Sequence, residues 1–345
     1  MTVDGRADSP DPVSPKGRDR RRRLLSRRSL VWIVIAVVLA VPAVVLPHLD
    51  LPAGGLIPIA QSLLPAGALG LLVVAVVAAV SRAWIGATVL VAGAVLSVLP
   101  VLNPAATGAG DCTGSTPLTV LSFNAKFAGA DPRQLADLIR DAGADVVILV
   151  ETDEHLIGQI LHGQGLAETL PYRTKQVSTN AYKGSVILSA YPLSAEADIP
   201  GSVFEQVSAV AALPDGSAVR VAAVHPPPPV GQPGDWYEAV TAIDEWIQAT
   251  SDPRLVIAGD FNSSFSHPVF RRVTAGLATA AQAAGPIPWP TWPQEKPVPA
   301  FTAIDHVLAR GAAPTGWDSA YIEGSDHRAV IANWALCDSA RGVSG

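Results

Sequence analysis

Residues 255–262 read Leu-Val-Ile-Ala-Gly-Asp-Phe-Asn, and this stretch decides how the rest of the chain is interpreted. Residues 255–258 have the length and β-branched content of a fully buried strand. Asp260 and Asn262 follow two positions apart, so their side chains point the same way from an extended chain. Asp260 can hold a water molecule or a cation, and Asn262 can bond a phosphate oxygen or the same water. Gly259 is expected to let a ligand approach the backbone closely, although an ordinary Asx turn after a strand is the alternative interpretation.

The chain has 345 residues and is uneven in composition and charge. Residues 1–28 are polar and rich in arginine, residues 30–102 are almost free of charge, and residues 113–336 have the composition of an ordinary α/β domain. Residues 1–103 carry 10 Lys and Arg against 5 Asp and Glu, whereas residues 104–345 carry 14 against 25. Because phosphate neutralisation needs Lys and Arg, the acidic part argues against a pure nucleic-acid-binding protein. The acidic composition is still compatible with an enzyme that binds phosphate through metal ions.

Three apolar segments indicate a membrane anchor. We expect transmembrane helices at about 30–49, 60–80 and 83–102, because a helix needs about 20 apolar residues to cross the hydrocarbon core. A buried helical hairpin in a soluble protein is one alternative, but helices of that kind normally carry a polar face. A cleaved signal peptide is another for the first segment, although Pro42 and Pro47 leave no clean cleavage site.

The distribution of charge around these segments predicts the topology. Residues 1–29 form a basic tail that we expect to be disordered and cytoplasmic, since arginines before the first span keep the N-terminus inside the cell. Arg82 lies in the turn between the second and third spans and favours the same side. Three spans from a cytoplasmic start place everything after residue 103 outside. We therefore expect a multi-pass protein of the cell membrane with an extracellular domain.

Cys112 and Cys337 are the two cysteines of the chain, and they bracket the globular part. A pair placed at both ends of a domain is expected to form a disulfide in an oxidising compartment, in agreement with an extracellular location. The alternative is two unrelated thiols. These observations predict a linker at 103–115, a globular domain at 116–337 and a short tail at 338–345.

Polar side chains end several apolar runs of this globular domain. Strands are expected at 118–123, 145–150, 184–188, 206–213, 218–224, 255–258, 303–309 and 329–336, with helices at 132–141 and 236–249. This interleaving predicts an α/β domain with mixed sheets. Ligands of α/β sheets bind where strand ends open, so we expect one site for metal, phosphate or proton transfer. Its candidate residues are Asn124, Glu151, His225, Asp260, Asn262, Asp305, Asp326 and His327.

The motifs around these residues resemble those of the endonuclease/exonuclease/phosphatase superfamily, which includes DNase I. They are Ser-Phe-Asn at 122–124, Val-Glu-Thr at 150–152, Val-His-Pro at 224–226, Gly-Asp-Phe-Asn at 259–262, Ile-Asp-His at 304–306 and Ser-Asp-His at 325–327. The resemblance implies a four-layer α-β-β-α sandwich, DNase I-like, with a cleft at the top of two facing sheets. The three preceding spans and Thr-Trp-Pro at 291–293 also resemble a membrane-anchored actinobacterial subgroup linked to glycopeptide (teicoplanin) resistance.

The resemblance also implies a metal site. Glu151 is expected to be the principal Mg²⁺ ligand, supported by Asn124, with Mn²⁺ as a possible substitute. Asp326 is expected to be a further metal ligand or a phosphate-side group. Lys126 stands where relatives often have an acidic metal-binding residue, so we do not expect a second metal there.

Catalytic roles follow from the same resemblance. Asp260 is expected to orient or deprotonate the attacking water, and Asn262 to hold that water or the phosphate. His327 is expected to contact the phosphoryl oxygens and to be oriented by Asp305. His225 resembles a second histidine of the DNase I branch that can protonate the leaving oxygen. The assignment of base and acid stays open at this point.

Together these expectations describe a membrane-anchored, extracellular, Mg²⁺-dependent phosphoester hydrolase in which water attacks phosphorus in line. The substrate is either nucleic acid or a lipid-linked phosphate of the cell envelope, and the acidic domain and the tether favour the lipid. A non-catalytic binding or sensor module at the cell surface is the alternative function. The expected partners are the lipid bilayer and the substrate, and the sequence indicates no stable protein partner.

Several other residues receive simpler interpretations. His306 is expected to point to the opposite face of its strand from Asp305 and to be structural. Trp289 and Trp292 lie in a Pro-rich loop, where they stack on a base, sit at a lipid interface or simply pack. Three more histidines are expected to face solvent or cap helices, namely His155, His162 and His267.

Overall fold

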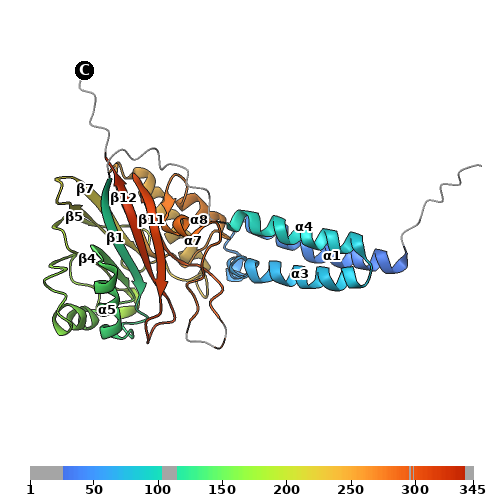
Figure 1. Cartoon of the computed structure of the whole chain (residues 1–345), viewed down its shortest axis with the longest axis horizontal. Helices are drawn as coiled ribbons and strands as arrows, with labels where there is room; N and C mark the ends of the chain where they lie inside the picture. The colour runs from blue at the N-terminus through green and yellow to red at the C-terminus, as the bar shows by residue number, and fades with distance from the viewer. Residues whose placement is uncertain (1–25, 103–114, 295–296, 298, 339–345) are drawn as a thin grey trace, which may run out of the picture.

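The computed structural model describes residues 26–102, 115–294, 297 and 299–338. A helical bundle projects from one side of a two-sheet sandwich (Figure 1). Most of the predicted basic tail, nearly all of the predicted linker and Cys112 lie outside the described residues, as do residues 339–345. The expected pairing of Cys112 with Cys337 therefore stays a prediction.

Three long helices form the bundle: α1 (Arg27–Val45), α3 (Leu64–Val80) and α4 (Trp84–Val98). Their packed faces are rich in alanine and glycine, which lets the backbones approach closely. A Cβ on Gly93 of α4 would lie only 2.5 Å from the Cβ of Ala40 on α1. The outward faces carry exposed leucine, valine and isoleucine.

Two helices are long and apolar enough to cross a membrane, Arg27–His48 and Trp84–Val101. A third candidate exists only if Ala53–Ser62 and Leu64–Val80, which meet at a bend of 62°, count as one broken span. The span expected at 60–80 is therefore interrupted near its start. Pro65 in the first turn of α3 favours a new helix there, because its missing N–H is not needed at that position.

The interruption leaves a separate short helix, α2 (Leu56–Ser62), between the bundle and the sandwich. It is preceded by two glycines in left-handed conformations, Gly54 and Gly55, which only glycine adopts readily. Further short helical segments are η1 (Leu46–His48), η2 (Ala53–Gly55), η3 (Leu99–Val101), η4 (Gln159–Gly163), η5 (Ala181–Lys183) and η6 (Ala280–Ala284).

Twelve strands in the described residues form two mixed six-stranded sheets. In spatial order, the first sheet contains β11 (Ala312–Ala320), β12 (Ala329–Cys337), β1 (Ser115–Asn124), β2 (Val146–Val150), β4 (Ser185–Ser189) and β3 (Tyr172–Arg173). The second contains β5 (Leu193–Asp198), β6 (Val207–Ala212), β7 (Ala218–Val224), β8 (Leu255–Asp260), β10 (Asp305–Arg310) and β9 (Ala278–Thr279). One neighbouring pair in each sheet is parallel, β1 with β2 and β7 with β8.

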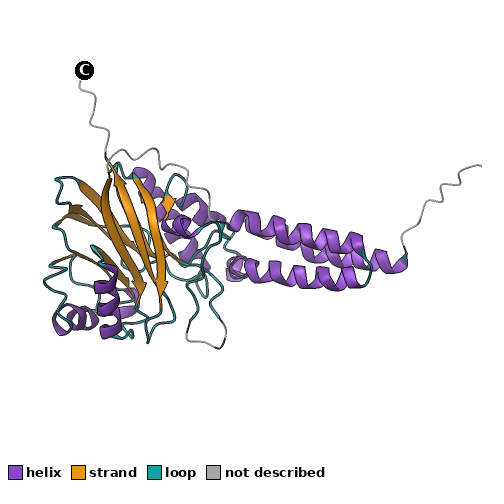
Figure 2. Ribbon diagram, viewed as in Figure 1, coloured by secondary structure: helices purple, strands orange, loops and turns teal. Residues whose placement is uncertain are grey.

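The two sheets pack face to face, and helices cover their outer faces (Figure 2). The central core consists of side chains from both sheets, such as Val120, Ile148 and Val256. The outer face of the first sheet is covered by α5 (Pro132–Ala142) and α6 (Glu154–Gly158), and that of the second by α7 (Pro233–Ala249) and α8 (Pro268–Val273). The predicted α/β sandwich with mixed sheets is thus confirmed.

Candidate active site

The parallel strand pairs bring the predicted site residues to one edge of the sandwich. Asn124 ends β1 and Glu151 follows β2, which lies beside it in the same sheet. In the facing sheet His225 follows β7, and Asp260 ends β8. Asp305 begins β10 directly opposite Asp260. Strand order therefore gathers residues that are separated by up to about 180 positions in the chain.

The backbone at this edge contains uncommon conformations. Glu151 and Asn262 have φ values of 50° and 46°, in the left-handed region that non-glycine residues rarely adopt. Gly259 is required for a different reason than the one expected from the sequence. A Cβ at Gly259 would lie 1.9 Å from the carbonyl oxygen of Val224 on β7, so the glycine accommodates the neighbouring strand rather than a ligand.

Two buried carboxylates form the centre of the site. The Asn124 Nδ2 donates to Glu151 Oε1 and to Asp260 Oδ2, both at 3.0 Å. Its amide oxygen faces the other way and accepts from the backbone N–H of Lys126 at 2.9 Å. Burial raises the pKa of Glu151, although the hydrogen bond from Asn124 opposes this. Two carboxylates held this close in the interior require a proton or a cation for balance.

His327 supplies a positive charge beside Asp260. Its Nδ1 lies 3.0 Å from Asp305 Oδ2, and its Nε2 lies 3.7 Å from Asp260 Oδ2. Burial alone would lower the pKa of His327, but the charges of Asp305 and Asp260 outweigh it and raise that pKa to about 10. Burial raises the pKa of Asp260 to about 7, against the lowering effect of His327. The site therefore holds an imidazolium next to a carboxylate that titrates near neutral pH.

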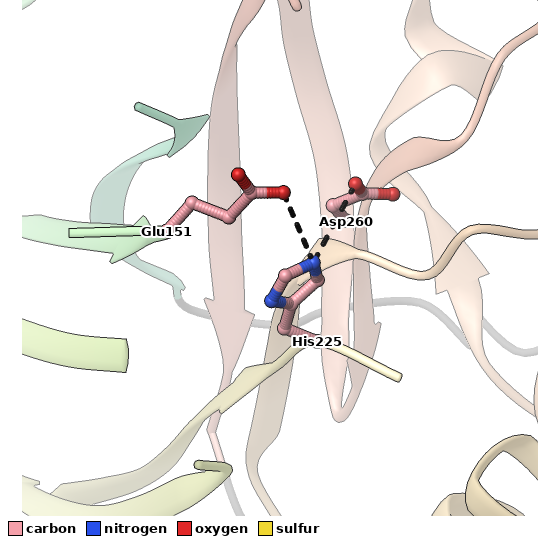
Figure 3. Close-up of side chains that lie close together, drawn as sticks. All are labelled: Glu151, His225 and Asp260. Atoms are coloured by element: carbon pink, nitrogen blue, oxygen red, sulfur yellow. Dashed lines mark ion pairs between the residues drawn. The ribbon is translucent and has the colours of Figure 1, made fainter. Parts of the chain in front are cut away.

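His225 lies in a contrasting environment. Its Nε2 is 3.6 Å from Glu151 Oε1 and 3.9 Å from Asp260 Oδ2 (Figure 3). Neither ring nitrogen has a hydrogen-bond partner among the described residues, and the ring packs 4.8 Å from that of Phe204. Burial, followed by the charge of His327, lowers the pKa of His225 to about 3. A neutral imidazole that faces two carboxylates is suited to donate its lone pair to a cation rather than to release a proton.

These atoms fit a divalent cation. Glu151, His225 and Asp260 each offer one ligand atom, and the three atoms lie within 4.8 Å of one another. The unpartnered His225 nitrogen and the carboxylate oxygens are donors that such ions accept. The ligand atoms of a second group, Asp260, Asp305 and His327, also lie within 4.8 Å of one another. There, however, the imidazole is already paired with Asp305, so the first group fits better.

A cavity of about 370 Å³ opens onto this site. We call its charged and amide-bearing side the polar end, formed by Lys126, Glu151, Asp260, Asn262, Asp326 and His327. Its other side, the apolar wall, is formed by Ile59, Leu63, Phe127, Val230, Trp292 and Phe301. Three predicted site residues lie behind this lining, namely Asn124, His225 and Asp305.

Two predicted residues of the polar end make their own contacts. The backbone N–H of Asn262 donates to Asp260 Oδ1 at 2.8 Å, and its side-chain nitrogen donates to the carbonyl oxygen of Pro226 at 3.0 Å. Asp326 lies 3.9 Å from Lys126 Nζ, farther out in the cavity. Asn262 thus fixes the orientation of Asp260, whereas Asp326 belongs to the outer part of the site.

Sequence reasoning missed part of the cavity. Leu63 lies in the transmembrane span expected at 60–80 and Ile59 directly precedes it, and composition alone gives no signal that this stretch folds back onto the site. His267 was expected to face solvent or cap a helix. It stands at the N-cap position of α8, but it is fully buried and its side chain contacts α2 instead of capping that helix. His306 is structural as predicted: it is buried against Phe270, and its Nε2 lies 2.9 Å from the carbonyl oxygen of Ser263.

Comparison with known proteins agrees with this geometry. A model of the Endonuclease/Exonuclease/phosphatase family matches residues 121–327. No curated protein sequence matches the chain, so the expected likeness to glycopeptide-resistance proteins stays a prediction.

Solved structures with a similar fold are distant in sequence. An endonuclease/exonuclease/phosphatase from Bacteroides vulgatus has a TM-score of 0.52 at 15% identity, covering 64% of this chain and 99% of its own. D. rerio TDP2 complexed with a single-strand DNA product has a TM-score of 0.52 at 16% identity, with the same coverage. The human Nocturnin catalytic domain has a TM-score of 0.50 at 14% identity, covering 63% and 94%. At such identities the likeness establishes the fold alone.

Proposed function

Because the chain belongs to the endonuclease/exonuclease/phosphatase family, we propose that it is a membrane-anchored, extracellular phosphoester hydrolase that depends on Mg²⁺. The family is one of phosphoester hydrolases that depend on divalent metals. The observation that carries the proposal is the buried group of Glu151, Asp260 and His327 at the polar end of an open cavity, with His225 directly behind it. These residues combine a cation site, a carboxylate that titrates near neutrality and an imidazolium.

The cation would be held mainly by Glu151, with the His225 nitrogen facing it and Asp260 at its edge. Asn124 would keep both carboxylates in place through its two hydrogen bonds. Oxygen ligands favour Mg²⁺, and Mn²⁺ is a suitable substitute. When bound, the cation would offset the negative charge that develops on the phosphoryl oxygens. Asp326, near Lys126, would act on the phosphate side of the cavity.

Asp260 is the proposed base for the attacking water. Its pKa of about 7 leaves a large fraction ionised near neutral pH, while the carboxylate stays basic enough to accept a proton. The Asn262 N–H holds Oδ1, and Asn124 and His327 lie beside Oδ2, so the carboxylate is fixed in the orientation in which Oδ2 would accept the proton of the water. His327, kept charged by Asp305, would donate to the phosphoryl oxygens opposite the leaving group.

The anchor is proposed from the distribution of charge along the bundle. Arg27 and Arg28 begin α1, and Arg82 lies in the turn between α3 and α4. Both places are at the end of the bundle distant from the sandwich (Figure 1). Basic residues next to spans favour the cytoplasmic side, so the sandwich would lie outside the cell. The bent pair of α2 and α3 would count as the second of three spans, with α3 as the part that lies in the hydrocarbon core.

The test is hydrolysis of bis(p-nitrophenyl) phosphate by the full-length protein in detergent micelles. We expect release of p-nitrophenol with Mg²⁺ or Mn²⁺, none with a chelator, and none from Asp260→Asn. Asp137→Asn is the matched control, since Asp137 is an exposed carboxylate on α5 that pairs with Arg140, away from the cavity lining. Folded protein that hydrolyses neither this ester nor plasmid DNA, RNA or a lipid phosphate with any metal would favour the binding or sensor module instead.

A further inference from the structure

The short helix α2 brings the N-terminal segment to the active site. His267, which precedes α8, places its Nε2 3.0 Å from the carbonyl oxygen of Pro58 and 3.3 Å from Ser62 Oγ, both on α2. Arg271 of α8 donates to the carbonyl oxygen of Pro47 at 2.5 Å, and Arg272 pairs with Asp50. The His267 contacts fix α2 itself against the sandwich, and the two arginines hold the segment that precedes it, so the side chains of α2 occupy a defined place beside the cavity.

The same helix supplies part of the apolar wall. Ile59 and Leu63 line the cavity that Glu151, Asp260 and His327 close at its polar end. Large apolar side chains on this wall remain exposed, by 38% for Ile59, 45% for Leu63, 58% for Phe127 and 66% for Val230. A cluster of exposed apolar side chains next to a polar site indicates a ligand with an apolar part.

The apolar surface continues from the cavity toward the bundle. A second cavity, of about 420 Å³, lies between the bundle and the sandwich and shares Phe301 and Thr302 with the first. Its bundle side includes Val98 and Leu102, and its sandwich side includes Trp289. An apolar path therefore leads from the site to the helices that would cross the bilayer.

The charges around the cavity do not suit a polyanion. Among its lining residues, Lys126 and His327 are the cationic ones, against the carboxylates of Glu151, Asp260 and Asp326. Nucleic acids are held by several Lys and Arg contacts to successive phosphates. A single phosphate at the polar end, joined to an apolar chain, matches both the charge and the apolar wall.

We propose that the substrate is a phosphoester of a membrane lipid, with its phosphate at the polar end and its hydrocarbon chain along α2. This inference rests on the proposed hydrolase function and names the substrate class for that site. Hydrolysis would join the water oxygen to phosphorus and break one P–O ester bond, and the departing oxygen would take up a proton. The chain stays in contact with Ile59 and Leu63 as it leaves the bilayer, which avoids exposing its methylenes to water.

The first experiment compares two substrates on full-length protein in phosphatidylcholine vesicles. An isoprenyl phosphate lipid and bis(p-nitrophenyl) phosphate are offered with Mg²⁺ to the parent, Ile59→Ser, Leu63→Ser and Leu56→Ser. Leu56 is the matched control, since it is an exposed leucine of α2 outside the cavity lining. We expect the ratio of lipid to soluble kcat/KM to fall about tenfold in each wall variant and to stay unchanged in Leu56→Ser.

A second experiment measures binding without turnover. Hexyl, octyl and decyl phosphate compete with the soluble ester, and their affinity for the parent should rise about tenfold for every two methylenes added. Quenching of tryptophan fluorescence reports the same binding, because Trp292 lies in the apolar wall. The rise with chain length should be smaller in Ile59→Ser and Leu63→Ser.

The outcomes separate this inference from the function on which it rests. In one outcome the protein hydrolyses the soluble ester and Asp260→Asn does not, but affinity does not depend on chain length or the wall variants leave the ratio unchanged. This outcome would support the hydrolase function and overturn the lipid substrate. Turnover of DNA or RNA without turnover of the lipid would do the same. Folded protein that is inactive on every ester would overturn both.

Discussion

The polar end and the apolar wall of the cavity are held in place in different ways. The polar end is built on the ends of buried strands, and each of its central carboxylates accepts two or more hydrogen bonds from within the sandwich. The apolar wall depends on α2, which His267 contacts directly and whose preceding segment Arg271 and Arg272 hold, all across more than 200 positions of the chain. The sandwich therefore holds the catalytic carboxylates in fixed positions, whereas the proposed substrate preference depends on α2, which lies outside the sandwich.

The largest expected effect comes from removing charge at the polar end. Glu151→Gln and Asp260→Asn should each lower kcat by about a thousandfold, because one removes the main cation ligand and the other the proposed base. Thermal unfolding of both variants should occur at or above the parental temperature, since each buried carboxylate is costly in the folded state. Retained activity in either variant would show that the chemistry lies elsewhere.

Asp305→Asn is expected to have the next largest effect, about a hundredfold on kcat. Asp305 raises the pKa of His327, so the parental imidazolium persists up to about pH 10. In the variant that pKa falls, and the alkaline limb of the pH–rate profile should move to lower pH. Profiles measured from pH 6 to pH 10 check this. A loss of rate without any shift of the limb would indicate a purely structural role for the pair.

The free energy of unfolding should decrease in acid because of His267, which holds α2 at the apolar wall. Burial lowers the pKa of His267 to about 4, so between pH 6.5 and pH 4 the unfolded chain binds a proton there that the folded chain does not. The contribution of His267 to the free energy of unfolding is therefore fully present above pH 6.5. It decreases by about 2 kcal/mol between pH 7 and pH 5. His267→Gln, which still can donate to Pro58, should lose that part of the pH dependence in unfolding experiments. An equal fall in both proteins would contradict the assignment.

The smallest effect is expected from the ion pair of Arg272 with Asp50. Both side chains are more than a third exposed, so solvent screens the pair, and Arg272→Ala should cost less than about 1 kcal/mol. Turnover of the soluble ester should change by less than twofold. A double-mutant cycle with Asp50→Asn measures the coupling. A coupling of several kcal/mol would mean that the wall is held as firmly as the polar end.

Sequence patterns were sufficient for the interior of the sandwich. The strand expected at 218–224 is β7 (Ala218–Val224), and the run 255–258 lies within β8 (Leu255–Asp260), since continuous apolar runs mark strands buried on both faces. β11 (Ala312–Ala320) was missed because it is half-exposed and its pairing is irregular between Pro314 and Gly316. Edge strand β5 (Leu193–Asp198) was missed because it is largely polar and exposed.

The polar end of the candidate site was predictable from the sequence, whereas its apolar wall was not. Motifs at strand ends identified the residues of the polar end, because strand order fixes where those ends meet. The apolar wall was not predictable, since a continuous span was expected from residue 60 and the position of α2 depends on its contacts with His267. The neutral state of His225 also depends on burial, which a tripeptide motif does not specify.

The bend between α2 and α3 also determines how the protein would sit in a bilayer. After the bend, α3 has 17 residues, which span roughly 26 Å at the helical rise, against about 30 Å for a typical hydrocarbon core. A bilayer can accommodate a short span by becoming thinner around it, at a modest cost for each ångström of mismatch. Lipid headgroups would then be drawn down around α2, and the cavity opening would rest among them rather than above them.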